Sequence, residues 1–146
     1  MRLSQRADYA LRAALDLAVQ QAPGRYSCTA EIARRTGTPS KFLEAILGQL
    51  RRAGIVESRR GAHGGHRLAR PPAGVTAAEV WRAVDGPVAL VGRPQRRRGN
   101  GDGAARVIRH LWEEVEGAVT KTVEGVSLED LARHAQEASS IADYSI

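Results

Sequence analysis

Residues 27–70 decide the fold, and their sequence is SCTAEIARRTGTPSKFLEAILGQLRRAGIVESRRGAHGGHRLAR. The first part predicts a short helix, because apolar residues recur on one face and Ser27 or Thr29 is placed to cap its N-terminus. Gly37 is expected to end this helix, since glycine commonly follows the last helical residue. The apolar positions of the short helix are Ala30, Ile32 and Ala33.

A longer helix is predicted directly after this turn. Thr38 can cap it, and Pro39 suits its first position, where the missing N–H of proline costs nothing. Gly54 is placed to be its C-terminal cap. A short helix, a glycine-containing turn and a longer helix are typical of a helix-turn-helix, although helical hairpins also occur in proteins that never bind nucleic acid. The apolar face of the longer helix consists of Leu43, Ile46, Leu47 and Leu50.

A β-hairpin is predicted to follow the helix-turn-helix. Residues 55–58 can form one strand and residues 66–69 the returning strand, with a glycine-containing loop between them. Pro71 and Pro72 are expected to end the second strand. A hairpin in this place is a wing, so the predicted fold class is mainly α with a small β-hairpin wing, a winged helix-turn-helix. The loop glycines are Gly61, Gly64 and Gly65.

Positive charge is concentrated in the same region. The chain of 146 residues has a formal charge of +6, with +7 in residues 1–86 and −1 in residues 87–146. Between Lys41 and Arg70 there are 7 basic and 2 acidic residues. A helix N-terminus, a wing and an excess of positive charge are what binding to a phosphate backbone requires. The sequence therefore predicts double-stranded DNA as the partner.

Helices are also predicted outside this stretch. The apolar spacing indicates a first helix over residues 5–21 and a fourth over residues 77–85. The next stretch has a composition typical of a loop and includes three consecutive arginines, 96–98. We therefore divide the chain into a DNA-binding domain, a linker and a C-terminal segment, with the bounds 1–86, 87–103 and 104–146.

A long amphipathic helix is expected over residues 104–124. One helix cannot bury its own apolar stripe, so the stripe needs either the rest of its domain or a second subunit. We interpret this helix as a dimerisation helix, followed by a last helix that Ser127 caps. The stripe consists of Ile108, Leu111, Trp112, Val115 and Val119.

Several motifs, taken together and in order, resemble the Rrf2 family of transcription regulators, the group that includes IscR, NsrR and CymR. The resemblance runs from Met1 to about Leu90 and resumes around Trp112. The motifs are MRLS at 1–4, DYALRA at 8–13, EIA at 31–33, FLE at 42–44, LRRAGIV at 50–56 and GGHRLARPP at 64–72.

The resemblance implies a homodimer that binds imperfect palindromes in DNA, usually as a repressor. Many members of the family hold an iron–sulfur cluster on three cysteines between the wing domain and the long helix. This chain departs from that pattern, because residues 88–111 contain no cysteine and Arg106 stands where the last ligand cysteine is expected. Asp8 matches a ligand position of nitric-oxide-sensing members, but a lone carboxylate does not hold such a cluster. We therefore expect no cofactor and interpret Asp8 as a solvated residue or one that supports its helix.

Three groups of residues are predicted to contact DNA. Ser40, Lys41 and Glu44 are expected to face the major groove, where short polar and charged side chains recognise base edges. Wing residues are expected to reach the minor groove or the phosphates. The resemblance adds phosphate contacts at the edges of the motif, although Tyr9 suits a half-buried core position equally well. The wing residues are Arg59, Arg60, Gly64, Gly65 and His66, and the added contacts are Tyr9, Arg12 and Thr29.

Two further features have a functional and a plainer interpretation. His63 and His66 form a pair on the wing, but zinc needs three or four ligands, so no metal site is predicted. Cys28 is the only cysteine and precedes the short helix, where a helix N-terminus can lower a thiol pKa. It is a candidate thiol sensor, although we favour a small half-buried residue without a redox role.

The sequence contains no catalytic motif, so we expect a regulator and not an enzyme. A second class of protein remains open, an adaptor that docks on a metabolic enzyme, although an adaptor would not need the positive charge between Lys41 and Arg70. A single cysteine fits a reducing compartment, and no stretch is apolar enough for a signal peptide or a membrane span. We therefore expect a cytoplasmic protein, for which an effector of unknown chemistry would be a further partner.

Overall fold

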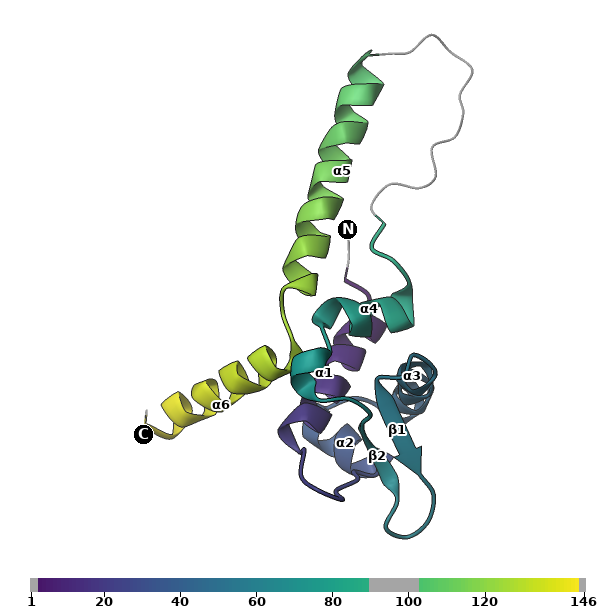
Figure 1. The fold of residues 1–146 in the computed structure, drawn as a ribbon, viewed down its shortest axis with the longest axis vertical. Coiled ribbons are helices and arrows are strands. Elements are labelled where there is room, and N and C mark those ends of the chain that lie inside the picture. Colours follow the sequence, from purple (N-terminus) through teal and green to yellow (C-terminus); the bar gives the residue numbers. More distant parts are fainter. Residues whose placement is uncertain (1–2, 90–102, 145–146) are drawn as a thin grey trace.

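The computed structural model describes residues 3–89 and 103–144, with the side chains of residues 142–144 left aside. The described part is mainly helical with one two-stranded antiparallel hairpin, which confirms the predicted fold class (Figure 1). Residues 90–102, which include the arginines at 96–98 and most of the predicted linker, lie outside the described residues. The elements are α1 (Gln5–Val19), α2 (Thr29–Thr36), α3 (Ser40–Arg52), β1 (Val56–Arg59), β2 (Gly65–Leu68), η1 (Pro72–Gly74), α4 (Ala77–Asp85), α5 (Gly103–Glu124) and α6 (Leu128–Tyr144).

The core is built around α1, which packs against α2, α3, α4 and α6. Four alanines of α1 are fully buried, and their small side chains let the neighbouring helices approach closely. Larger aliphatic side chains from the surrounding elements fill the remaining volume, and each contributes about 1.5–3 kcal/mol by its burial. The alanines are Ala7, Ala10, Ala13 and Ala14, and the larger residues include Ile32, Leu43, Leu50, Ile55 and Val80.

The first helix of the helix-turn-helix does not begin at the predicted cap. Its N-cap is Cys28, whose side chain makes no capping hydrogen bond, so the prediction that Ser27 or Thr29 caps α2 is wrong. The reason is tertiary, because Ser27 forms two backbone hydrogen bonds, of 2.8 and 2.9 Å, with His66 of β2. Gly37 ends the helix in the left-handed conformation, as predicted.

The second helix begins one residue later than predicted. Pro39 is the N-cap of α3 instead of its first residue, and Ser40 is the first helical residue. The predicted cap, Thr38, is buried, and its hydroxyl lies 2.9 Å from that of Thr36 at the end of α2. The Thr38 hydroxyl therefore belongs to the turn between the helices and not to the cap.

The end of α3 fixes the start of the wing. Gly54 has φ +76°, and its N–H donates to the Arg51 carbonyl at 3.0 Å, while the N–H of Ile55 donates to the Leu50 carbonyl at 3.0 Å. This pair of hydrogen bonds is a Schellman motif, in which glycine takes the left-handed position without steric cost. Because the N–H of Ile55 is used by the helix, β1 begins at Val56, one residue later than predicted.

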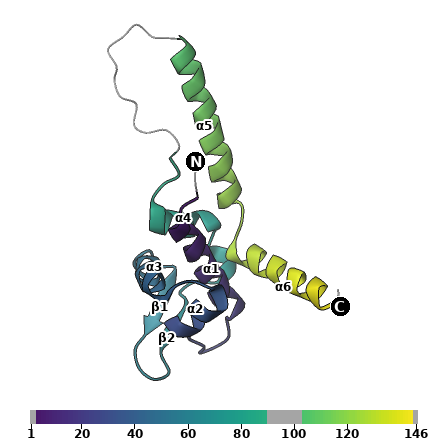
Figure 2. The same ribbon diagram turned by 180° about the vertical axis from the view of Figure 1, so that it is seen from behind.

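The helix α5 stands away from the rest of the molecule in both views (Figures 1 and 2). None of its residues is buried, and its C-terminal end packs against α4, where Arg82 forms an ion pair with Glu124 at 3.5 Å. The next helix, α6, returns to the core, since Leu128 is fully buried and α6 packs against α1 and η1. Ser127 caps α6 as predicted, because its hydroxyl accepts the Asp130 N–H at 3.0 Å.

Within residues 3–89 and 103–144, no helix combines the length and the hydropathy that crossing a membrane would require.

Candidate nucleic-acid interface

The exposed face of α3 carries the residues predicted to meet the major groove. Burial of Leu43, Ile46, Leu47 and Leu50 turns the opposite face of the helix outward. Ser40, Lys41 and Glu44 are all exposed near the N-terminal end of that face. The helix N-terminus adds its own partial positive charge there. The arrangement can therefore present a hydroxyl, an ammonium and a carboxylate to base edges.

An aromatic side chain that the sequence analysis did not single out lies among these residues. Phe42 is 41% exposed, and the Lys41 Nζ lies 5.1 Å from the centroid of its ring. The ring centroid of Tyr9 lies 6.1 Å away, so the half-buried Tyr9 and the exposed Phe42 form one aromatic edge between α1 and α3. The sequence could have indicated Phe42, because it is an aromatic residue that does not belong to the apolar face of its helix.

Basic residues of α1 border this edge. Arg12 pairs with Asp8 at 2.9 Å and its Nη1 lies 3.5 Å from the Thr36 carbonyl at the end of α2. Asp8 therefore supports its helix through Arg12, in agreement with the sequence interpretation. Six residues earlier, Arg6 donates to the Gln49 side chain of α3 at 2.8 Å.

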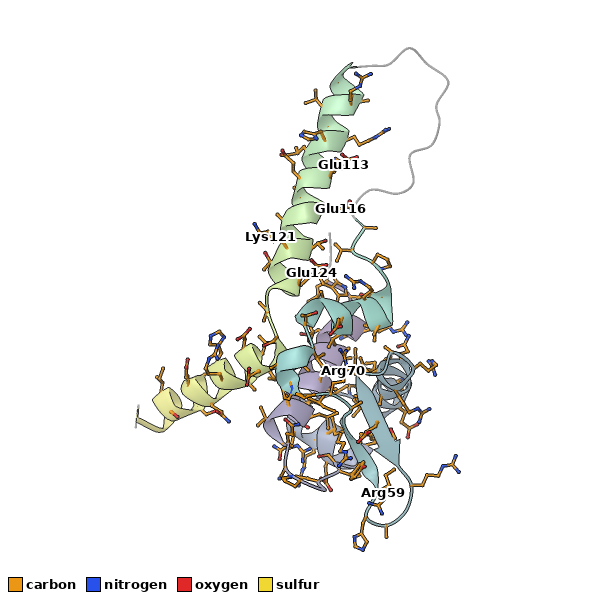
Figure 3. The ribbon with its side chains drawn as sticks, viewed as in Figure 1. Arg59, Arg70, Glu113, Glu116, Lys121 and Glu124 are labelled. Carbon is orange, nitrogen blue, oxygen red and sulfur yellow. The ribbon has the colours of Figure 1, made fainter. Side chains whose placement is uncertain are left out.

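The wing places its arginines at the outer end of the hairpin. Arg59 ends β1, and both Arg59 and Arg60 are exposed (Figure 3). Two of the three loop glycines, Gly64 and Gly65, face protein backbone instead. A Cβ on Gly64 would lie 2.0 Å from the Arg59 carbonyl oxygen, and one on Gly65 would lie 2.4 Å from the Ser27 oxygen. Packing within the molecule therefore explains these glycines without any approach to phosphates.

His66 joins the wing to α2. Its Nδ1 forms a hydrogen bond of 2.7 Å with the Ser58 hydroxyl, and its Nε2 forms one of 3.3 Å with the Thr29 hydroxyl. Burial, and then the positive charge of Arg51, lower the pKa of His66 below its ordinary value of 6.5. A neutral imidazole with both nitrogens engaged is placed to hold the wing against the helix-turn-helix.

A bidentate ion pair that the sequence analysis missed fixes α2 on α1. The Arg35 guanidinium donates to both carboxylate oxygens of Asp16, at 2.8 and 2.9 Å, and to the buried Ser27 hydroxyl at 2.8 Å. The hydrogen bond to Asp16 above all, and then the charge of Asp16 and the contact with Glu31, raise the pKa of Arg35. Such two-pronged pairs hold geometry as well as charge, so the Arg35 fork orients the start of the helix-turn-helix.

Cys28 is exposed at the N-cap of α2. Its thiol donates to a carboxylate oxygen of Glu31 at 3.4 Å. The half-buried position that the sequence analysis favoured for this residue is therefore wrong, because Thr29 and not Cys28 faces the wing.

Comparison with known proteins places this geometry in a family. The family model described as an iron-dependent transcriptional regulator, Rrf2, matches residues 3–134. The chain belongs to the Rrf2 family. A putative HTH-type transcriptional regulator of Mycobacterium tuberculosis is 37% identical over 136 residues, covering 90% of this chain and 81% of the relative. CymR of Bacillus subtilis is 31% identical, covering 92% and 91%.

Solved structures of Rrf2 regulators have the same fold. The structure of CymR of B. subtilis has a TM-score of 0.78 and 28% identity and covers 92% of this chain and 98% of that one. IscR of T. potens has a TM-score of 0.75 and 29% identity, with coverage of 94% and 90%. The chain is therefore a DNA-binding transcription regulator and not an enzyme, as the sequence predicted.

The donor atoms of this Rrf2 member do not fit an iron–sulfur cluster. Such clusters are held mainly by several cysteine thiolates, and Cys28 is the only cysteine of the chain. Within the described ranges, no three histidine, cysteine, aspartate or glutamate side chains lie close enough together to hold a metal ion.

The apolar stripe of α5 remains open to solvent. Ile108 is 52% exposed, Leu111 50% and Trp112 45%, and the adjacent Val107 is 70% exposed. Val115 and Val119, nearer to α4, are half-buried. Contiguous apolar side chains of this size at a surface mark an interaction site.

Proposed function

We propose that this Rrf2 member is a homodimeric repressor that binds an imperfect palindrome without an iron–sulfur cluster. The observation that carries the proposal is the open apolar stripe of α5 in a chain that also has a basic helix-turn-helix and wing. The occupant of the stripe is a second copy of α5, since two equivalent faces can cover each other in a closed dimer. The stripe consists of Ile108, Leu111, Trp112, Val115 and Val119.

Dimerisation lets the regulator contact two half-sites of DNA at once. A twofold axis between the α5 helices relates two copies of α3, which then enter successive major grooves about 34 Å apart. In each half-site, Ser40, Lys41 and Glu44 contact base edges, and Arg59 and Arg60 lie along the neighbouring minor groove. Tyr9, Arg12 and Thr29 contact phosphates around them, and these contacts fix the register.

Three residues of the predicted site, Gly64, Gly65 and His66, act on DNA binding indirectly, through the shape of the wing. Gly64 and Gly65 shape the wing loop against Arg59 and Ser27. His66, bonded to Ser58 and Thr29, holds the wing at the angle at which the arginines meet DNA. In this proposal, residues 1–86 bind DNA and residues 104–146 form the dimer. Residues 87–103 connect the two segments.

Repression follows from occlusion of the promoter in the cytoplasm, where the DNA lies. An effector, if it acts, changes the spacing of the two wings. Cys28 is the one thiol through which oxidation could act. Because its side chain makes no capping bond to α2, we expect a Cys28→Ser variant to respond to peroxide as the wild-type protein does.

The dimer is tested with one variant on the stripe and one off it. Leu111→Asp places a charge in the proposed interface, whereas Lys121→Asp places the same charge at an exposed position of α5 outside the stripe (Lys121 is labelled in Figure 3). Sedimentation equilibrium and DNA-binding anisotropy are measured for both. We expect Leu111→Asp to be monomeric and to lose tight binding, with Lys121→Asp unchanged. A Leu111→Asp protein that stays dimeric removes the stripe from the interface.

A further inference from the structure

We propose that Tyr26 is a positioning residue for the wing arginines and that it sets how Arg59 meets the minor groove of DNA. This inference rests on the proposed function, because it concerns the same wing. Tyr26 lies in the loop between α1 and α2, outside the helix-turn-helix and outside the hairpin. The guanidinium carbon of Arg67 lies 4.5 Å from the centroid of its ring, and that of Arg59 lies 6.0 Å away.

The strand register explains why these side chains meet. Ser27 forms an isolated antiparallel bridge with His66 at the free edge of β2, so the loop lies beside the hairpin at this point. In an antiparallel register, the next pair is Tyr26 with Arg67. Because successive side chains of a strand alternate between faces, Tyr26 lies on the opposite face from Ser27, whose hydroxyl is buried.

A row of three side chains crosses this outer face. Glu57 lies opposite Arg67 in the hairpin and forms an ion pair with it, and the ring of Tyr26 lies on the other side of Arg67. The ion pair holds the Arg67 guanidinium in place, and the ring of Tyr26 packs against it. Tyr26 is half-buried, and its contacts with Arg67 and Arg59 are made within the chain itself.

Arg59 has no such neighbour within the hairpin. It lies two residues after Glu57 on the same face, and the residue opposite it in β2 is Gly65, which has no side chain. Gly65 is required there by the close approach of the Ser27 carbonyl. The ring of Tyr26 is therefore the group from outside the hairpin that restrains Arg59, by a cation–π contact. A restrained guanidinium loses less conformational entropy when it enters a narrow minor groove.

The test uses DNA sites that the full-length wild-type protein selects from a random pool. Tyr26→Leu keeps an apolar side chain without the ring, and Tyr26→Phe keeps the ring without the hydroxyl. We expect Tyr26→Leu to bind the selected site about two- to fivefold more weakly, the worth of an exposed cation–π contact. Tyr26→Phe is expected to bind as the wild-type protein does, and thermal melting confirms that both variants are folded.

Two further readouts separate positioning of Arg59 from a general role in folding. Replacing adenine by 2,6-diaminopurine adds an amino group in the minor groove alone. We expect it to weaken wild-type binding at one position of each half-site, and to weaken Tyr26→Leu less. Arg59→Ala is expected to cost less in the Tyr26→Leu background than in the wild type, because coupled residues are not additive.

The inference is overturned if Tyr26→Leu binds like the wild-type protein. It is also overturned if Tyr26→Leu weakens binding but diaminopurine weakens the variant as much as the wild-type protein, and if the losses of affinity in Tyr26→Leu and Arg59→Ala are additive in the double variant. If the wild-type protein enriches no site from the pool, the proposed function fails instead, and this result is obtained before any variant is made.

Discussion

Gly65 of the wing lies so close to Ser27 of the loop before α2 that a Cβ on the glycine would stand 2.4 Å from the Ser27 carbonyl oxygen. The contact accompanies the paired backbone hydrogen bonds between Ser27 and His66. It therefore ties the wing to the start of the helix-turn-helix, and it makes the orientation of the wing depend on a residue without a side chain.

Gly65→Ala is expected to destabilise the protein and to weaken DNA binding together. The backbone must shift to admit the methyl group, and overpacking of this kind costs about 1–3 kcal/mol. Urea unfolding measures the loss of stability. Gly74→Ala is the matched control, because a Cβ at Gly74 meets nothing within 4 Å and no positive φ strains it. Equal stability of the two variants would contradict the account of the wing.

Arg35→Ala is expected to lower the free energy of unfolding by about 1–3 kcal/mol, because Asp16 and the buried Ser27 hydroxyl lose their partner. Arg35→Lys should recover only part of this loss, since an ammonium cannot reproduce the two-pronged contact. Its neighbour Arg34 is exposed on α2, and Arg34→Ala should leave stability within about 0.5 kcal/mol of wild type. Denaturant titration of the three variants measures these free energies of unfolding. An Arg35→Ala protein as stable as Arg34→Ala would contradict the structural role of Arg35.

The stability of the wing should fall as the solution becomes acidic. The pKa of His66 in the folded protein is below its ordinary value of 6.5, so the unfolded chain binds a proton more readily than the folded one. The contribution of neutral His66 to the free energy of unfolding is therefore complete above pH 6.5. It is lost as the pH falls from 6.5 towards the lowered pKa of His66. His66→Gln cannot titrate and should flatten this part of the pH profile of unfolding. A profile that keeps its slope in the variant assigns the slope to another group.

Arg59→Ala is expected to weaken binding to the selected DNA about tenfold or more, which corresponds to at least about 1.4 kcal/mol. The negative potential of a narrow minor groove attracts the guanidinium, and alanine leaves that attraction unused. Arg133→Ala serves as the control, because Arg133 lies on α6 and pairs there with Asp130. Anisotropy titrations that give Arg59→Ala the affinity of the control would remove Arg59 from the site.

The elements of the fold could be predicted because their causes are local. Apolar residues at helical spacing and glycines at helix ends lie within a few residues of one another, so the sequence indicates α1, α3 and the wing. The start of α2 was missed because its cause is distant, since Ser27 is taken by His66, 39 positions later. Local capping preferences cannot show such a competitor.

The candidate site was predictable to a similar degree. Charged residues at exposed positions of α3 and at the end of the wing follow from periodicity and charge. The groups that orient them were missed, because Tyr26 and Arg35 act through partners that only the folded chain brings near. The glycines of the wing were found, but the reason for them lies in contacts across the fold.

We propose that this Rrf2 member recognises two inverted half-sites as a dimer without a cluster. The most direct test is selection from a random DNA pool by full-length protein that was purified with chelator, followed by anisotropy on the enriched site at several salt concentrations. We expect the enriched DNA to contain two inverted half-sites with centres about 10 base pairs apart. We also expect the affinity to fall steeply with salt, with a logarithmic slope of about −0.9 for each phosphate neutralised. A pool that stays random through repeated rounds, with an affinity indifferent to salt, would rule out such a dimer.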